Sequence, residues 1–157
     1  MKRILFVCTG NICRSPLAEA LLRRAVAERS LEIEVSSAGT GAWENAPASE
    51  GAYLVAMEKG LDLSSHRARL LTRELVQQAD LVLTMARHHR ARVDELGGGG
   101  KVAVLGEYAG RALADAEVSD PFGGVLEVYR DTYAELDGLV AAVAERLAAE
   151  AKRGDPR

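Results

Sequence analysis

Cys8 and Arg14 are the side chains of this sequence best suited, by type and spacing, to do chemistry. Cys8 directly follows the apolar run 4–7, and Arg14 stands six residues later. A loop between a strand and a helix lies where open α/β folds bind ligands, and the helix N-terminus there stabilises a thiolate. Arg14 can curl back and offer a fork of N–H donors to phosphate oxygens. The spacing predicts that Cys8 is a nucleophile and that Arg14 binds the phosphoryl group it attacks.

The residues from 8 to 15 suit an anion-binding loop, which we call the phosphate loop. Successive backbone N–H groups can form a nest for an anion, and Gly10 and Asn11 tolerate the left-handed backbone that a nest requires. Ser15 can donate its hydroxyl proton to the sulfur of Cys8. The predicted phosphate-binding residues are Thr9, Gly10, Asn11, Ile12, Cys13, Arg14 and Ser15.

A general acid is also needed, because an alkoxide or phenoxide leaves poorly without a proton. Asp120 is the best candidate, since it lies in the irregular stretch 117–124 and Pro121 stiffens the loop that carries it. An Asp-Pro pair alone is a common turn. The assignment of Asp120 therefore depends on the presence of the phosphate loop.

The elements that must position these residues alternate between strands and helices. The apolar run 4–7 is typical of a central parallel strand, and Pro16 suits the first position of a helix reaching residue 29, with Ser15 as a candidate N-cap. Alternating elements predict one α/β domain over residues 1–157, with a parallel sheet. Other strands are expected over 33–35, 80–85 and 102–105. Helices are expected over 47–59, where Gly60 ends the helix, directly after a cap at Thr72, and over 87–96 and 125–147. Residues 36–47 are expected to form a loop, and residues 152–157 a frayed tail.

Composition and charge limit the partners of this chain. Its 157 residues, 48% of them hydrophobic, can bury one core. A net charge of −3 predicts no basic face for nucleic acid or an anionic membrane, and no apolar run approaches the roughly 20 residues that span a bilayer. With two cysteines and no secretory signal, free thiols in the cytoplasm are expected rather than a disulfide framework.

The sequence resembles the low-molecular-weight protein tyrosine phosphatase family. Residues 6–16 match its N-terminal signature, and segments 37–40, 60–69, 80–85 and the Asp120-Pro121 pair follow in family order, so the similarity covers about residues 3–150. The resemblance implies a doubly wound, four-stranded parallel sheet with helices on both faces. It also implies a two-step reaction without metal or cofactor, in which Cys8 attacks phosphorus and Arg14 holds the oxygens. Asp120 would protonate the leaving group and then activate water against the phosphocysteine.

The resemblance also implies roles for other residues and for ligands. His66 would support the phosphate loop through Asn11, and Cys13 would form a disulfide with Cys8 under peroxide, although Cys13 also suits a small buried hydrophobe. His88 and His89 are expected to be solvated helix residues, and the three histidines lack the spacing of a metal site. The substrate would be a phosphorylated protein, and phosphate-like oxyanions would inhibit.

Two phosphorylated side chains compete as the substrate. Ile12 at the rim of the phosphate loop, Trp43 in the 39–46 loop and Phe122 are expected to wall a slot for the ring of phosphotyrosine, although Trp43 also suits a packing role. The stretch 120–124 is instead similar to a bacterial branch that hydrolyses phosphoarginine. That branch has threonine where this chain has Ile12. Because this position contacts substrate, phosphotyrosine is favoured, with phosphoarginine as the alternative.

Two further functions fit less well. Arsenate reduction on this fold passes a disulfide to later cysteines, but no cysteine follows Cys13. An inactive phosphate-binding module could dispense with Cys8 and Asp120, and both are present. Catalysis by phosphoryl transfer is therefore favoured.

Overall fold

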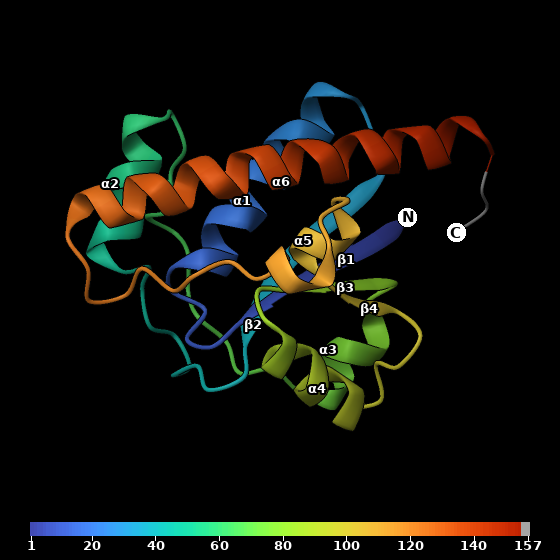
Figure 1. Ribbon diagram of the computed structural model, residues 1–157, viewed down its shortest axis with the longest axis horizontal. Helices are drawn as coiled ribbons and strands as arrows, with labels where there is room; N and C mark the ends of the chain where they lie inside the picture. Colours follow the sequence, from blue (N-terminus) through green and yellow to red (C-terminus); the bar gives the residue numbers. More distant parts are fainter. Residues whose placement is uncertain (155–157) are drawn as a thin grey trace.

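The computed structural model describes residues 1–154, and a parallel sheet of four strands forms its centre (Figure 1). The strand order is β2-β1-β3-β4, so the strand that precedes the phosphate loop lies in the interior of the sheet. This confirms the predicted four-stranded parallel sheet. The strands are β1 (Lys2–Cys8), β2 (Ile33–Gly39), β3 (Leu81–Thr84) and β4 (Val102–Val104).

Strand β1 is apolar on both faces because each face packs against its own hydrophobic core. Ile4, Phe6 and Cys8 belong to one core, and Leu5 and Val7 belong to the other. This alternation follows from the two-residue period of a strand. The predicted burial of β1 on both faces is confirmed.

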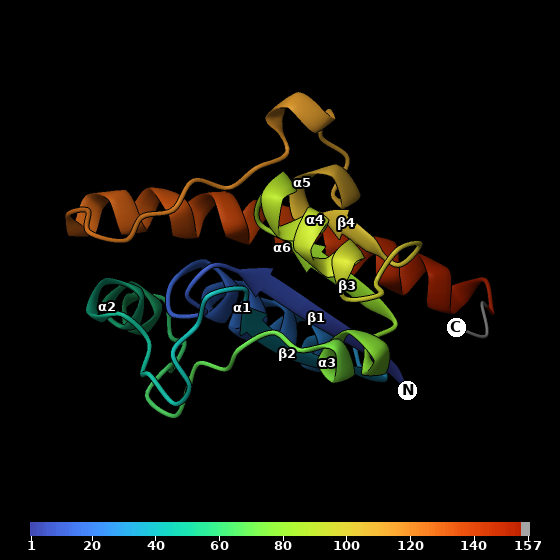
Figure 2. The same ribbon diagram turned by 90° about the horizontal axis from the view of Figure 1, so that it is seen from below.

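Helices cover both faces of the sheet (Figures 1 and 2). Helices α1 (Arg14–Glu28), α2 (Glu50–Glu58) and α6 (Leu126–Lys152) contribute to the first core. The second core lies under α3 (Arg73–Gln78) and α4 (Arg87–Glu95), which come to the front of the sheet in Figure 2. The predicted doubly wound arrangement is confirmed.

Sequence signals at the helix ends correctly predicted the end of α2 and the start of α3. Gly60 follows α2 with φ of +79°, the left-handed conformation that glycine adopts after a helix. The Thr72 side chain accepts a 3.2 Å hydrogen bond from the backbone N–H of Leu75 and caps α3, as predicted.

Other boundaries differ from the prediction. Residues 36–39, expected in a loop, extend β2 because the strand pairs with β1 as far as Cys8 and Gly39. Residue 105 was expected in a strand, but Leu105–Tyr108 form the short helix α5. Neither α5 nor the 3-10 turn η1 (Leu113–Asp115) was predicted.

The start of α1 also differs. Arg14 is its first residue and Cys13 its N-cap, so Pro16 occupies the third helical position and Ser15 does not cap the helix. Proline is tolerated there because the first four N–H groups of a helix have no intrahelical acceptor. At the other end of the chain, α6 continues to Lys152, the first residue of the expected frayed tail. Residues 155–157 of that tail lie outside the described part of the chain.

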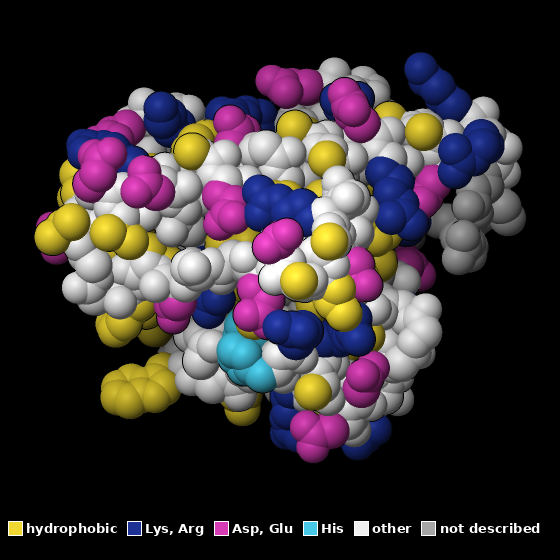
Figure 3. Space-filling model, in the orientation of Figure 1, with side chains coloured by type: hydrophobic (Ala, Val, Ile, Leu, Met, Phe, Trp, Pro, Cys, Tyr) yellow, Lys and Arg dark blue, Asp and Glu magenta, His cyan; other side chains and the backbone are white. Residues whose placement is uncertain are grey.

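Acidic and basic side chains are interspersed over α6 on the face seen in Figure 3. Arg130 pairs with Glu58 at 2.8 Å and with Glu127 at 3.2 Å, and Arg111 pairs with Glu135 at 2.8 Å. Such exposed pairs contribute at most about 1 kcal/mol each. Within residues 1–154, every helix is too short or too polar to cross a membrane.

Candidate active site

The backbone of the phosphate loop turns its carbonyl groups outward. In a trans peptide the N–H of the next residue points the opposite way, so the N–H groups of Ile12, Cys13 and Arg14 face the pocket. The N–H of Asn11 lies 3.3 Å from Cys8 Sγ and donates to it. The loop can therefore surround an anion with backbone donors. The carbonyl oxygens accept from Thr40 N (to Cys8, 2.9 Å), Gly41 N (to Thr9, 2.9 Å), His66 Nε2 (to Asn11, 2.7 Å), Ser49 N (to Ile12, 2.9 Å) and Leu17 N (to Cys13, 3.3 Å).

Asn11 supplies the left-handed residue of the loop, with φ of +56°, whereas Gly10 has no positive φ. Asparagine adopts this conformation more readily than most residues because its short side chain can hydrogen-bond locally. Of the two residues that tolerate this conformation, Asn11 thus adopts it and Gly10 does not.

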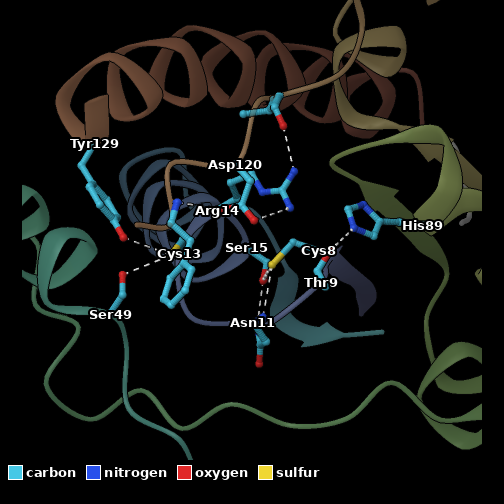
Figure 4. A network of polar contacts seen from close by, with 12 residues as sticks. Cys8, Thr9, Asn11, Cys13, Arg14, Ser15, Ser49, His89, Asp120 and Tyr129 are labelled. Carbon is cyan, nitrogen blue, oxygen red and sulfur yellow. Dashed lines mark hydrogen bonds and ion pairs between the residues drawn. The ribbon is translucent and has the colours of Figure 1, made fainter. Parts of the chain in front are cut away.

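A directed chain of hydrogen bonds ends at the sulfur of Cys8 (Figure 4). The backbone N–H of Arg69 donates to Asn11 Oδ1 at 3.0 Å, which leaves Asn11 Nδ2 to donate to Ser15 Oγ at 2.8 Å. Since Ser15 Oγ accepts that bond, its own hydrogen is free to point at Cys8 Sγ, 2.9 Å away. The chain can stabilise a thiolate by a hydroxyl donor.

The second hydrogen of the Asn11 amide is held as well. It is donated to Ser37 Oγ at 2.9 Å, and Ser37 in turn donates to a carboxylate oxygen of Glu19. Glu19 also pairs with Arg23 at 2.7 Å. The Asn11 side chain thus has a single orientation, because each of its polar atoms has a partner of fixed role.

Gly39, at the end of β2, allows the phosphate loop to lie directly against the sheet. A side chain at this position would collide with the carbonyl oxygen of Thr9 and would come within 2.9 Å of the backbone nitrogen of Asn11. A glycine is therefore required here by close approach rather than by its backbone angles.

Arg14 is buried, with 5% of its surface exposed, and is one of the residues that line the pocket. Its Nη1 donates to the carbonyl oxygen of Val118 at 2.8 Å, and its Nη2 lies 3.6 Å from Asp120 Oδ2. Its Nε is buried and has no hydrogen-bond partner within the described residues. A buried donor without a partner is costly, and an anion in the loop would satisfy it.

Asp120 lies at the mouth of the same pocket, in residues 117–124, which we call the acid loop. Its Oδ1 accepts a 3.1 Å hydrogen bond from the backbone N–H of Phe122, while its Oδ2 faces Arg14. The side chain is about half exposed, at 48%. Asp120 is therefore oriented by its own loop and remains accessible to an incoming group.

The structure brings most of the predicted site residues around one pocket of about 170 Å³. Trp43 is not among the lining residues: it is 84% exposed, so the expected tryptophan wall is absent from this pocket. Phe122, 65% exposed, stands at the rim. The lining residues are Cys8, Thr9, Gly10, Ile12, Cys13, Arg14, Asp120 and Phe122.

Cys13 differs from Cys8 in its surroundings, although both are buried free thiols. Its sulfur lies 3.1 Å from Ser49 Oγ and 3.6 Å from the hydroxyl of Tyr129. Burial raises the pKa of the Cys13 thiol, and the hydrogen bonds with Ser49 and Tyr129 offset part of that rise. Cys13 therefore remains a protonated thiol near neutral pH and is poorly suited to be the nucleophile.

Two of the three histidines contact the phosphate loop. His66 donates to the Asn11 carbonyl, the contact that the family resemblance implied. His89, expected in solvent, is instead fully buried, with Nε2 2.8 Å from Thr9 Oγ1. The expectation failed because α4 packs His89 and Val93, one helical turn apart, against the second core and the loop. His88 is exposed, as expected.

We expect His89 to make the protein less stable in acid. Burial, together with repulsion from His88 and Arg14, lowers the pKa of His89 from 6.5 to about 3, and Glu117 opposes this shift. The unfolded chain binds this proton below pH 6.5 and the folded protein only near pH 3, so stability falls between these values. At pH 4.5 the loss is roughly 2–3 kcal/mol relative to pH 7.

Urea unfolding of wild type and His89→Gln at pH 7 and 4.5 measures this contribution. Glutamine does not titrate, so the acid-induced loss should be smaller in His89→Gln, whereas His88→Gln, which keeps His89 and its burial and removes only the repulsion from His88, should keep most of the loss. The same acid-induced loss in all three proteins would contradict the expectation.

Sequence reasoning missed several residues that hold the site. These residues contact the loop from four different parts of the fold, so no short motif contains them. They are Ser37, Ser49, Tyr129 and His89. Only His89 carried a usable signal, since it lies four residues before Val93 on the apolar stripe of its helix. Within residues 1–154, no three His, Cys, Asp or Glu side chains are grouped as a metal site.

Known proteins resemble the chain over nearly its whole length. A family model described as low molecular weight phosphotyrosine protein phosphatase matches residues 3–153. The protein-arginine-phosphatase of Bacillus subtilis (strain 168) is 40% identical over 146 residues, covering 92% of this chain and 95% of that protein. The low molecular weight protein-tyrosine-phosphatase Wzb of Escherichia coli (strain K12) is 38% identical over 149 residues, covering 94% and 96%.

A solved structure agrees with the sequence matches. The low molecular weight protein tyrosine phosphatase from T. tengcongensis has a TM-score of 0.86 and 40% identity, covering 93% of this chain and 99% of that one. Proteins named for arginine and for tyrosine are thus about equally similar to this chain. Overall identity does not choose between the two substrates.

Proposed function

Because the chain belongs to the low molecular weight phosphotyrosine protein phosphatase family, we propose that it hydrolyses phosphotyrosine in proteins through a phosphocysteine on Cys8. The observation that carries the proposal is the meeting of Cys8, Arg14 and Asp120 around one small pocket. These three residues supply a nucleophile, an oxyanion ligand and an acid.

In the first step, the Cys8 thiolate attacks phosphorus and the bond from phosphorus to the leaving oxygen breaks. The loop N–H groups and the unpaired Nε of Arg14 hold the phosphoryl oxygens. Asp120, at the pocket mouth, gives its proton to the leaving oxygen, so that a phenol rather than a phenoxide departs. The products are the free tyrosine side chain and a phosphocysteine.

In the second step, the Asp120 carboxylate takes a proton from water, whose oxygen attacks phosphorus. The phosphorus–sulfur bond breaks and the electron pair returns to Cys8. The Ser15 hydroxyl, 2.9 Å from the sulfur, then stabilises the departing thiolate. This step releases inorganic phosphate and leaves Asp120 protonated again, as it was before the first step.

The pocket walls support phosphotyrosine as the substrate. Ile12 and Phe122, both among the lining residues, offer apolar surfaces to an aromatic ring. A phosphoguanidinium group would instead need acceptors for its N–H groups, and Asp120 is the one carboxylate among the lining residues. Trp43 stands outside the pocket and is available for the protein part of the substrate.

Phosphoarginine remains the second candidate, because a relative at 40% identity is named a protein-arginine-phosphatase. Assays with a phosphotyrosine peptide, a phosphoarginine protein and a phosphoserine peptide, all with a chelator present, compare the alternatives. We expect turnover of phosphotyrosine and inhibition by phosphate. Negligible phosphotyrosine turnover, or loss of activity in chelator, would overturn the proposal.

Ile12 is expected to set part of this preference. Ile12→Thr should shift the ratio of kcat/KM values toward phosphoarginine by about tenfold, because it adds a hydroxyl and removes apolar wall. Ile12→Val is the matched control, since valine has the shape of threonine without the hydroxyl. If both variants shift the ratio equally, the hydroxyl has no part in specificity.

We further propose that Cys13 protects the nucleophile. Peroxide would oxidise the Cys8 thiolate to a sulfenic acid, and the Cys13 thiol would displace water from it to form a disulfide that a thiol reductant reverses. Catalysis requires reduced Cys8, which supports a reducing compartment, the cytoplasm, as the location.

A further inference from the structure

His89 is a buried polar residue that the two reaction steps do not use. Its ring is 0% exposed, and Nε2 has its one hydrogen bond with Thr9 Oγ1 at 2.8 Å. Its Nδ1 is buried and has no partner within the described residues. An apolar ring would fill this volume without leaving a polar atom unsatisfied. The contact with Thr9 is therefore what the imidazole adds at this position.

Thr9 follows the nucleophile directly and lies at one end of the phosphate loop. Figure 4 shows the loop held from two sides, with Ser49 and Tyr129 at Cys13 and His89 at Thr9. Within residues 1–154, His89 is the side chain that hydrogen-bonds to the Thr9 side chain.

The segment from the end of β3 to the first turn of α4, which carries His89, also holds the acid loop. The backbone N–H of Arg87 donates to a Glu117 carboxylate oxygen at 2.8 Å, and that of Val118 donates to the Met85 carbonyl at 2.9 Å. Val118 in turn accepts from Arg14. The end of β3 and the first turn of α4 thus contact both the loop with the nucleophile and the loop with the acid.

We infer that His89 is a positioning residue that, through Thr9, holds the phosphate loop in the geometry needed for phosphoryl transfer. The inference rests on the proposed function. Because burial and nearby positive charge lower the pKa of His89 to about 3, the ring stays neutral near neutral pH. It therefore orders the loop without placing a second cation beside Arg14.

The test compares His89→Phe, which removes the polar contact, with His89→Gln, which can keep a polar atom near the Nε2 position. With p-nitrophenyl phosphate, His89→Phe and Thr9→Val should each lower kcat/KM about 10- to 100-fold, as expected for a misplaced reacting group. His89→Gln should stay within about threefold of wild type, and His88→Gln should match wild type.

Two readouts separate positioning from a merely structural role. Inorganic phosphate should inhibit His89→Phe more weakly than wild type, and iodoacetamide should alkylate Cys8 more slowly than in wild type. The double variant of His89→Phe and Thr9→Val should be no worse than the poorer single variant, because both break the same contact.

Three results would overturn the inference: additive losses in the double variant, unchanged alkylation, or a lower Tm with unchanged kcat/KM. If His89→Phe does not fold, Thr9→Val tests the inference alone. Activity equal to wild type in Thr9→Val would then contradict the positioning role of His89. Absence of activity in wild type would instead contradict the proposed function, while alkylation of Cys8 would still report on the loop.

Discussion

Cys8→Ser is expected to lower turnover of a phosphotyrosine peptide by at least about 10³-fold while phosphate still binds. A serine hydroxyl is a far weaker nucleophile than a thiolate, and the hydroxyl of Ser15, 2.9 Å from the sulfur of Cys8, is not a base that could activate it. The loop N–H groups and Arg14 remain, so calorimetry should give a Kd for phosphate within a few fold of wild type.

Cys13→Ser is the matched control for this variant, because Cys13 is the other buried thiol of the same loop. It should keep most of the turnover, since burial raises the pKa of Cys13 and keeps it protonated. It should also lose the recovery of activity by reductant after peroxide. A loss in Cys13→Ser as large as in Cys8→Ser would reverse the assignment of the nucleophile.

Asp120→Asn is expected to have an effect that depends on the leaving group. A phenol such as tyrosine, with a pKa near 10, needs a proton as it departs, so hydrolysis of a phosphotyrosine peptide should fall by about 10²- to 10⁴-fold. p-Nitrophenolate is a much better leaving group, and its phosphate ester should be affected far less. The measurement is the ratio of kcat/KM values for the two substrates.

Asp115→Asn controls for the loss of a negative charge near the acid loop. Asp115 is exposed and is not among the residues that line the pocket, so its variant should stay within about twofold of wild type on both substrates. Equal losses for good and poor leaving groups in Asp120→Asn would remove Asp120 as the acid.

The parts of the fold that the sequence predicted well depend on neighbours within a few residues. The apolar run of β1, the Thr72 cap of α3 and the glycine after α2 each express a local preference. The extension of β2 to Gly39 and the helix at Leu105 depend on pairing and packing between segments far apart in the chain. Those boundaries were wrong for that reason.

The candidate site divides in the same way. Cys8 and Arg14 lie in one continuous loop, so their spacing alone predicted that they would meet. The predictions for Trp43 and His89 were both wrong. The tryptophan expected at the pocket is exposed, and the histidine expected in solvent is buried. Exposure depends on which segments pack together, and a residue type alone does not report it.

The sequence by itself determined which groups are candidates for the chemistry: a thiol, an arginine at phosphate-loop spacing and an aspartate on a stiffened loop. Local backbone preferences and side-chain types are sufficient for that. Only the tertiary structure decided how the loop is held, with the side chain of Asn11 fixed between its partners and His89 in contact with Thr9. The contact of His89 with Thr9 and those of Ser37 and Arg69 with Asn11 join residues far apart in sequence, and only the packing of α4, β2 and the 61–69 segment around the loop brings them within hydrogen-bond distance.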